Sequence, residues 1–276
     1  MASEEKTRHR LTLKYFIFSM IITIIIANTI VIFSESHSKH SISLWILNIT
    51  AATASILGII AICRYGTHGL HGKSYLFLTL GLISWFSADF TLLYDYYIMG
   101  IKEQRLVTTT DALWFVGYGF LALHLFIVIR SLYIKIKSKV VILVSIITVL
   151  FISYNLVNLL SYDFYINNNF IAIIVTLLYP ILDFILIIPS LIILVTLRND
   201  YEQNIPWFLS SLSLLVNAIA DDGYINDFVT GNSEISWFWE LFYITDFIIM
   251  SGALFWYNKF HISNAIRNIK LNNHHK

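Results

Sequence analysis

Apolar stretches of about 20 residues recur along nearly the whole chain and constrain its fold more than any other feature. A helix of that length crosses the hydrocarbon core of a bilayer, which is about 30 Å thick. Only 13% of the residues are charged, against about 25% in an ordinary soluble domain. A transmembrane β-barrel would show alternating polarity over segments of about ten residues, and the sequence shows none. It therefore predicts an all-α integral membrane protein.

Hydropathy divides the chain into eight predicted membrane spans, which form a single transmembrane domain over residues 1–276. The sixth span is long enough to tilt in the membrane, or to kink near Pro180 and Pro189. The predicted spans are residues 15–34, 43–62, 75–98, 111–132, 140–161, 170–197, 207–226 and 237–257.

The basic residues give these spans an orientation, because cytoplasmic loops of membrane proteins are enriched in Lys and Arg. With the N-terminus in the cytoplasm, only Lys39, Lys102 and Arg105 of the 18 basic residues fall on the outer side. Eight spans return the C-terminus to the cytoplasm, so we expect a multi-pass protein of the cell membrane with both termini inside. The cytoplasmic set is Lys6, Arg8, Arg10, Lys14, Arg64, Lys73, Arg130, Lys135, Lys137, Lys139, Arg198, Lys259, Arg267, Lys270 and Lys276.

The first span follows basic residues, as a secretory signal would, but its apolar core of about 19 residues exceeds the usual 7–15. No small-x-small cleavage pattern precedes Glu35, so we expect an uncleaved anchor. Cys63 is the only cysteine, which excludes an intrachain disulfide and a cysteine-based zinc site. The net charge of +1 gives no sign of nucleic-acid binding. No cofactor is predicted, and any signalling output would need a partner, since the tail at residues 262–276 is short.

An internal similarity relates the two halves of the chain, residues 1–136 and 137–261. Because each half crosses the membrane an even number of times, the similarity predicts two parallel four-helix repeats. Chance resemblance between apolar segments is the alternative. Asp89 aligns with Asp221 and Asp95 with Asp227 at an offset of 132, and Asp111 aligns with Glu240 and Trp114 with Tyr243 at an offset of 129.

Several carboxylates lie inside the predicted spans, whereas every Lys and Arg lies at or beyond a span end. A charged group at that depth costs about 2.5–3.5 kcal/mol on insertion, so it normally faces the bundle interior and often marks a functional site. At a rise of about 1.5 Å per residue, Asp89 and Asp246 lie about 13 Å below the outer ends of their helices. Asp221 and Asp222 are shallower, and Asp183 lies near the midplane. The acids therefore predict an outward-facing acidic cavity.

Helical spacing gives most of these acids a polar or aromatic neighbour one turn away. Tyr179 precedes Asp183 by four residues and Asn217 precedes Asp221 by four, so each could hydrogen-bond the following carboxyl group. His124, in the fourth span, could meet a carboxylate in the same cavity. The alternative is that each buried acid is protonated and simply hydrogen-bonded between helices.

Several specific chemistries find no support in the sequence. Covalent retinal would need a lysine deep in the last span, where Met250 stands. Histidine pairs at positions 37/40 and 68/71 fall in loops on opposite sides of the membrane, so no metal site is predicted. A Gly-rich phosphate loop, a nucleophile elbow and an HExxH motif are all absent.

Three stretches, Ser87–Asp89, Phe115–His124 and Ala220–Asp221, resemble the YhhN family of lysoplasmalogenase-like eight-span membrane proteins. The resemblance extends over most of the chain as topology and over about twenty positions as sequence. The family has Gly-Asp and Ser-Asp pairs where this chain has Ala-Asp in both places.

The resemblance implies that water attacks the vinyl-ether bond of a lysophospholipid, giving an aldehyde and a glycerophospho-alcohol. Asp89 and Asp221 would be the catalytic acid–base pair, with His124 orienting one of them. Lys102 and Arg105, in the loop beside the cavity mouth, could hold the lipid phosphate. A solvated outer loop is the plainer interpretation of these two basic residues.

Three functions remain open. The leading hypothesis is that the acidic cavity binds, and hydrolyses, a lipid or other small amphiphile. The alternatives are a sensory membrane module that acts through a partner protein, and a small transporter that uses the acids for protons or cations. The residues predicted to bind a ligand are Asp183, Asp222, Asp246, Tyr179, Asn217, Lys102 and Arg105.

Overall fold

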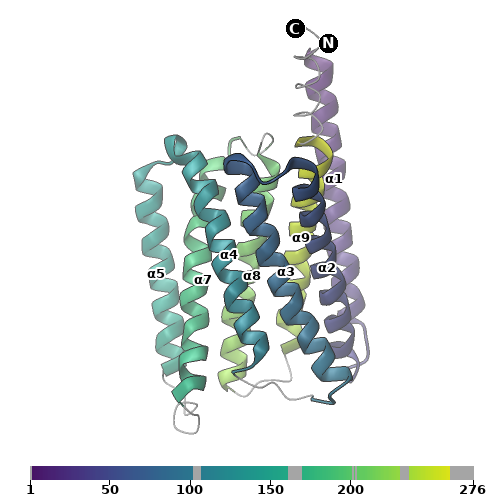
Figure 1. The fold of residues 1–276 in the computed structure, drawn as a ribbon, viewed down its shortest axis with the longest axis vertical. Helices are drawn as coiled ribbons and strands as arrows, with labels where there is room; N and C mark the ends of the chain where they lie inside the picture. The colour runs from purple at the N-terminus through teal and green to yellow at the C-terminus, as the bar shows by residue number, and fades with distance from the viewer. Residues whose placement is uncertain are drawn as a thin grey trace.

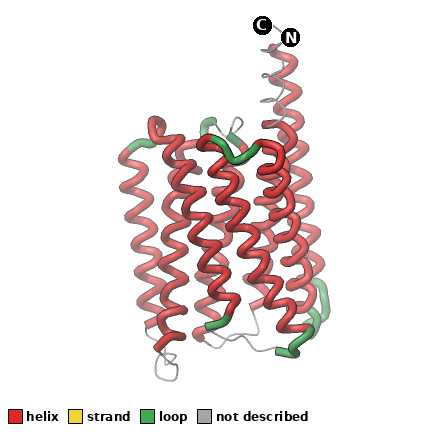
Figure 2. The backbone as a smooth tube through the Cα atoms, viewed as in Figure 1, coloured by secondary structure: helices red, strands yellow, loops and turns green. Residues whose placement is uncertain are grey.

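The computed structural model describes residues 2–101, 107–160, 170–200, 202, 204–230 and 236–261. These residues form eight long helices and no strand (Figure 2). The prediction of an all-α protein is confirmed. The helices are α1 (Ala2–Ile32), α2 (Lys39–Tyr65), α3 (Gly69–Tyr97), α4 (Thr109–Leu132), α5 (Ser138–Leu160), α7 (Phe170–Leu197), α8 (Ile205–Thr230) and α9 (Ser236–Trp256), with short helices η1 (Tyr133–Lys135) and η4 (Tyr257–His261).

Within the described residues, six helices are long and apolar enough to cross a membrane: α1, α2, α3, α4, α7 and α9. α5 supplies a shorter apolar stretch, Ser138–Tyr154, and α8 carries Asp221 and Asp222. Large apolar side chains such as Phe18 and Phe126 are exposed on the outside of the bundle, where lipid rather than water would cover them. The chain is a multi-pass helical membrane protein, and the count of eight spans stays a prediction.

Six helices pack as a closed ring. α2 packs on α3, α3 on α4, α4 on α7, α7 on α8, α8 on α9, and α9 on α2. The other two long helices of the described chain lie outside this ring, α5 along α7 and α1 along α9. They occupy opposite edges of the bundle, and α1 extends well beyond the ends of its neighbours (Figure 1). The ring therefore brings side chains of α3, α4, α7, α8 and α9 toward a common interior.

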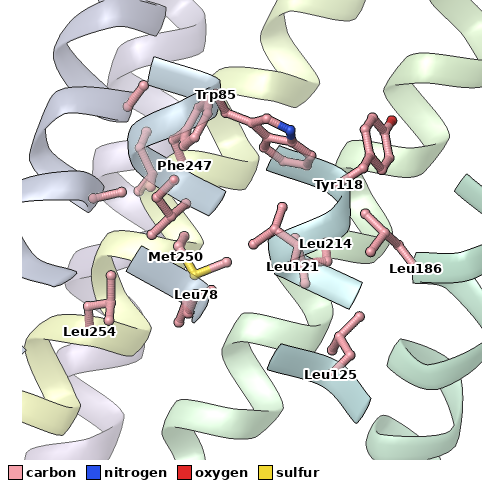
Figure 3. Close-up of a cluster of buried hydrophobic side chains, with 14 of the residues drawn as sticks. Leu78, Trp85, Tyr118, Leu121, Leu125, Leu186, Leu214, Phe247, Met250 and Leu254 are labelled. Carbon is pink, nitrogen blue, oxygen red and sulfur yellow. The ribbon is translucent and has the colours of Figure 1, made fainter. Parts of the chain in front are cut away.

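Large apolar side chains from facing helices fill that interior (Figure 3). Leu82 on α3, Leu121 on α4 and Leu214 on α8 are almost completely buried. Trp85 meets the ring of Tyr118 edge to face at a centroid distance of 5.3 Å, and that of Phe247 at 6.5 Å. Burial of such side chains fixes the rotation of each helix about its axis, which in turn decides where the polar side chains point.

α3 and α4 approach each other closely because glycines stand at their contact. A Cβ atom on Gly81 would lie 2.7 Å from Cγ of Leu121, and one on Gly117 would overlap the indole ring of Trp85. Small residues at such positions let membrane helices pack with their backbones close together. Gly119, two residues further along α4, faces open space.

α7 continues as one helix through both of its prolines. Pro180 and Pro189 each lack the backbone N–H that would bond the preceding turn, yet the helix runs from Phe170 to Leu197. A break at either proline is not observed, and α7 presents Tyr179, Asp183 and the residues that follow on a single element.

Candidate functional site

Three side chains from three helices meet at the centre of the candidate site. The hydroxyl oxygen of Tyr118 on α4 lies 2.7 Å from Oδ1 of Asp183 on α7, and it also contacts Oδ2 of Asp221 on α8. Tyr118 and Asp183 are buried, with exposed fractions of 3% and 0%. One hydroxyl group therefore joins the carboxyl groups of two helices.

Asp221 accepts hydrogen bonds from two further side chains. Nδ2 of Asn217, one turn earlier on α8, donates to Oδ2 of Asp221 over 2.8 Å, which is the bond that their spacing predicts. The hydroxyl of Tyr243 on α9 donates to Oδ1. Because donors converge on Asp221 from three helices, it is the acid best placed to carry negative charge.

The other predicted acids gather around Asp221. Asp89, Asp183, Asp222 and Asp246 each interact electrostatically with it. These five aspartates, which come from α3, α7, α8 and α9, are called the acidic cluster below. The ring thus brings together acids that lie far apart in the sequence, as their predicted depths suggested.

Asp89 and Asp246 have fewer hydrogen-bond partners than Asp221. Nε1 of Trp114 on α4 lies 3.3 Å from Oδ1 of Asp89, and the hydroxyl of Ser213 on α8 donates to Oδ1 of Asp246. Both aspartates are buried. Each therefore ties its own helix to a neighbour in the ring.

Three carboxyl oxygens of the acidic cluster are buried without a hydrogen-bond partner among the described residues. They are Oδ2 of Asp183 and both oxygens of Asp222. Buried polar atoms of native proteins are hydrogen-bonded in about 90% of cases or more. The ion pairs of the described residues also leave the acidic cluster without a basic partner. These oxygens therefore have no donor within the described residues.

Trp85 on α3 positions Tyr118. Its indole Nε1 donates to the backbone oxygen of Trp114 over 3.2 Å, and its ring packs edge to face on the phenol ring of Tyr118. Gly117, immediately before Tyr118, leaves the space that the indole ring occupies. The packing of α3 on α4 thereby holds the hydroxyl of Tyr118 between Asp183 and Asp221.

Two more buried acids, one in the first turn of α4 and one in the second turn of α9, are each bonded across the ring. Asp111 on α4 accepts a hydrogen bond from the hydroxyl of Tyr179 on α7 over 2.7 Å. Glu240 on α9 accepts one from Ser43 on α2 and lies 2.7 Å from Nδ1 of His40. These contacts tie α4 to α7 and α9 to α2.

The expected bond between Tyr179 and Asp183 is not formed. Helical side chains lean toward the N-terminus of their own helix, so Tyr179 reaches back to Asp111 rather than forward to Asp183. Tyr118 takes the place of Tyr179 as the hydroxyl partner of Asp183.

His124 faces α3 rather than the acidic cluster. Its Nδ1 lies 2.8 Å from the hydroxyl oxygen and 3.0 Å from the backbone oxygen of Ser74. Its Nε2 is buried without a partner among the described residues. The expected contact between His124 and a carboxylate is therefore missing from the hydrogen bonds of the described chain. Lys102 and Arg105 lie outside the described residues.

Sequence reasoning did not single out Tyr118 or Tyr243 as site residues. A signal for each was present, since Tyr118 lies inside the Phe115–His124 stretch and Tyr243 aligns with Trp114 in the internal similarity. In the part of the chain that the structure describes, no three His, Cys, Asp or Glu side chains are placed to hold a metal ion.

Comparison with known proteins gives no relative: no protein family, curated protein or solved structure matches this chain. The fold and the site together define the class of protein, a multi-pass α-helical membrane protein with buried aspartates gathered inside a ring of helices.

Proposed function

We propose that the chain crosses the membrane eight times, with both termini in the cytoplasm, as two parallel halves at residues 1–136 and 137–261. Helix packing supports this proposal: α3 packs on α4 as α8 packs on α9, and α2 on α3 as α7 on α8. In this comparison α2, α3 and α4 correspond to α7, α8 and α9. The contact of α2 with α9 in one direction therefore corresponds to the contact of α7 with α4 in the other, and both are present. α1 and α5 depart from it, because α1 packs along α9 whereas α5 packs along α7.

The hydrogen bonds of the aligned residues support the same proposal. Trp114 donates to Asp89 in the first half, and Tyr243, which aligns with Trp114, donates to Asp221 in the second. The acids near the starts of α4 and α9, Asp111 and Glu240, are likewise each bonded to a helix of the other half, through Tyr179 and Ser43. The acceptor positions therefore correspond in both pairs, and the donor positions correspond in the pair of Trp114 and Tyr243, which supports a relation between the two halves.

The function that the site supports best is binding of a lipid or other small amphiphile through a cationic or hydrogen-bond-donating end. The observation that carries it is the set of unpartnered oxygens on Asp183 and Asp222, buried in an acidic cluster that no described ion pair neutralises. A buried acceptor without a donor costs about 1–3 kcal/mol, so a ligand that donates to these oxygens removes a penalty. An anionic end would instead meet like charges.

Hydrolysis of that amphiphile is the finer part of the proposal and rests on the resemblance to the lysoplasmalogenase-like family. When two carboxyl groups serve as the general acid and the general base, they must be in different protonation states. The geometry favours Asp183 with Asp221, which Tyr118 joins, over Asp89 with Asp221. His124 has no hydrogen bond to either acid of this pair among the described residues, since its Nδ1 meets Ser74.

Three decyl amphiphiles that differ only in charge test the binding proposal. Decylamine should raise the apparent Tm of the purified protein above the effect of decanol, and decyl sulfate should not. At a concentration about 100 times Kd, the expected stabilisation is about 2.7 kcal/mol. Asp222→Asn should reduce it, whereas Asp227→Asn, on the same helix but bonded to Trp239, should keep it.

Equal effects of the three amphiphiles on the wild-type protein would contradict the binding proposal. Hydrolysis has a separate readout, because a lysoplasmalogen supplied to the same preparation should release an aldehyde that Asp221→Asn no longer releases. If the wild-type protein binds decylamine but releases no aldehyde, the binding proposal stands and the hydrolysis proposal is contradicted.

A further inference from the structure

The contact geometry of Tyr118 limits how protons are distributed in the acidic cluster. Its hydroxyl carries one proton, yet its oxygen is within hydrogen-bond reach of Oδ1 of Asp183 and Oδ2 of Asp221. It can donate to one carboxyl group and must accept from the other. A carboxyl group donates only when it is protonated, so one of these two acids holds a proton while the other accepts one.

We infer that Tyr118 relays a proton between Asp183 and Asp221. In the transfer, the carboxylic proton of Asp183 moves to the phenolic oxygen as the phenolic proton moves to Oδ2 of Asp221. One O–H bond breaks and one forms at the tyrosine, which ends neutral, while Asp183 becomes the carboxylate and Asp221 the acid. No other reactant is needed, and the step reverses along the same two hydrogen bonds.

Asp183 and Asp221, the two acids of the relay, differ in their other hydrogen-bond partners. Asp221 also accepts from Asn217 and Tyr243, which stabilise its ionised form. Asp183 is fully buried and has no further partner at Oδ2 among the described residues. That oxygen is where a ligand or a water molecule can give or take the proton. The relay therefore adds proton exchange to the binding function proposed above and does not depend on it.

The titratable groups around the relay come from five of the ring helices, α3, α4, α7, α8 and α9. The aspartates among them repel one another when ionised, so a proton or a cation arriving at the pair lowers that repulsion. No lysine or arginine of the described residues forms an ion pair with any of these acids. The groups that interact electrostatically with Asp183 or Asp221 are Asp89, Asp222, Asp246, Tyr118, Tyr179 and Tyr243.

Infrared spectroscopy of the purified full-length protein tests the relay. The wild-type protein at neutral pH should show a protonated carboxyl C=O band that shifts to lower frequency in D₂O. Asp183→Asn should remove this band. Asp221→Asn should shift it, because the proton loses its alternative acceptor. In Tyr118→Phe the Asp221→Asn change should move the band of Asp183 less than it does in the wild-type background, because the hydroxyl bridge is gone and only the direct interaction of the two carboxyl groups remains.

Tyr243→Phe is the matched control. It removes a hydroxyl that bonds Asp221 alone, so the effect of Asp221→Asn on the Asp183 band should persist. The inference would be overturned if neither Asp183→Asn nor Asp221→Asn removed a protonated carboxyl band from the wild-type spectrum. This outcome can be read even if Tyr118→Phe does not fold. A coupling of undiminished size in folded Tyr118→Phe would overturn it as well. Failure of decylamine to bind would count against the proposed function. It would not affect the spectra expected for the relay, so the two proposals can fail separately.

Discussion

Trp85→Ala should destabilise the folded protein by about 3–5 kcal/mol, the cost of truncating a buried tryptophan where the surroundings cannot collapse into the cavity. Trp85 is 3% exposed and contacts Tyr118, Phe247 and the backbone of Trp114. Removing the indole would leave a space at the centre of the ring and free the phenol of Tyr118 to move. Denaturant unfolding of the purified protein measures the loss of stability. Far-UV circular dichroism serves as the signal, because it reports helix content rather than tryptophan fluorescence.

Trp45→Ala is the control for this substitution. Trp45 lies on α2 with 49% of its surface exposed, and its indole bonds the hydroxyl of Tyr97 over 3.0 Å. Its truncation creates no internal cavity, so the expected loss is about 1 kcal/mol or less. Equal losses for the two tryptophans would mean that Trp85 does not occupy the interior of the ring.

Gly117→Ala should destabilise the protein by about 1–3 kcal/mol, as overpacking does in a close-packed core. The added methyl group would overlap the indole ring of Trp85, whose Nε1 is held by the backbone oxygen of Trp114. α3 and α4 would have to separate, or the indole would have to leave its place against Tyr118. The same denaturant titration measures the change.

Gly119→Ala separates this steric effect from the general effect of replacing glycine in a helix. Gly119 meets open space, so alanine there should be neutral or stabilising by about 0.5–1 kcal/mol. In a Trp85→Ala background the penalty of Gly117→Ala should largely disappear, because the two side chains then no longer compete for one space. An undiminished penalty in that background would show that the clash is with another group.

The apolar part of each long helix could be predicted from the sequence, because hydropathy reports it directly. The span predicted at 170–197 coincides with α7, and the span predicted at 111–132 lies within two residues of α4. α1 begins at Ala2, well before the predicted 15, because its charged first turns are helical without being apolar. Hydropathy reports the part of a helix that lipid surrounds and misses the part that projects beyond it.

The composition of the acidic cluster could also be predicted, whereas its hydrogen bonds could not. Buried carboxylates are conspicuous in apolar spans, so Asp89 and Asp221 stand out in the sequence. The rotation of each helix is not encoded in the same way, since spans that are apolar nearly all round show no amphipathic face. For that reason Tyr118 was not predicted as a partner of Asp183. The partner of Tyr179 was predicted wrongly because its side chain leans toward the N-terminus of α7 and reaches Asp111.

The central claim is that eight spans place the acidic cluster in the outer half of the membrane. Cysteine labelling from one side of the membrane tests this claim most directly. The background is Cys63→Ser, since Cys63 is the only cysteine and is exposed. Single cysteines replace Ser36, Lys137, Asn199 and Lys259, which are all exposed and lie between or beyond different helices. A membrane-impermeant maleimide is applied to intact cells and to permeabilised cells.

We predict that Ser36→Cys reacts in intact cells and that Lys137→Cys, Asn199→Cys and Lys259→Cys react only after permeabilisation. α7 and α9 are long and apolar enough to cross the membrane. Given that they do, Lys137 and Asn199 share one side only if α5 also crosses, and Asn199 and Lys259 share one side only if α8 also crosses. Labelling of Asn199→Cys or Lys259→Cys in intact cells would contradict the eight-span topology, and with it the placement of the acidic cluster in the outer half.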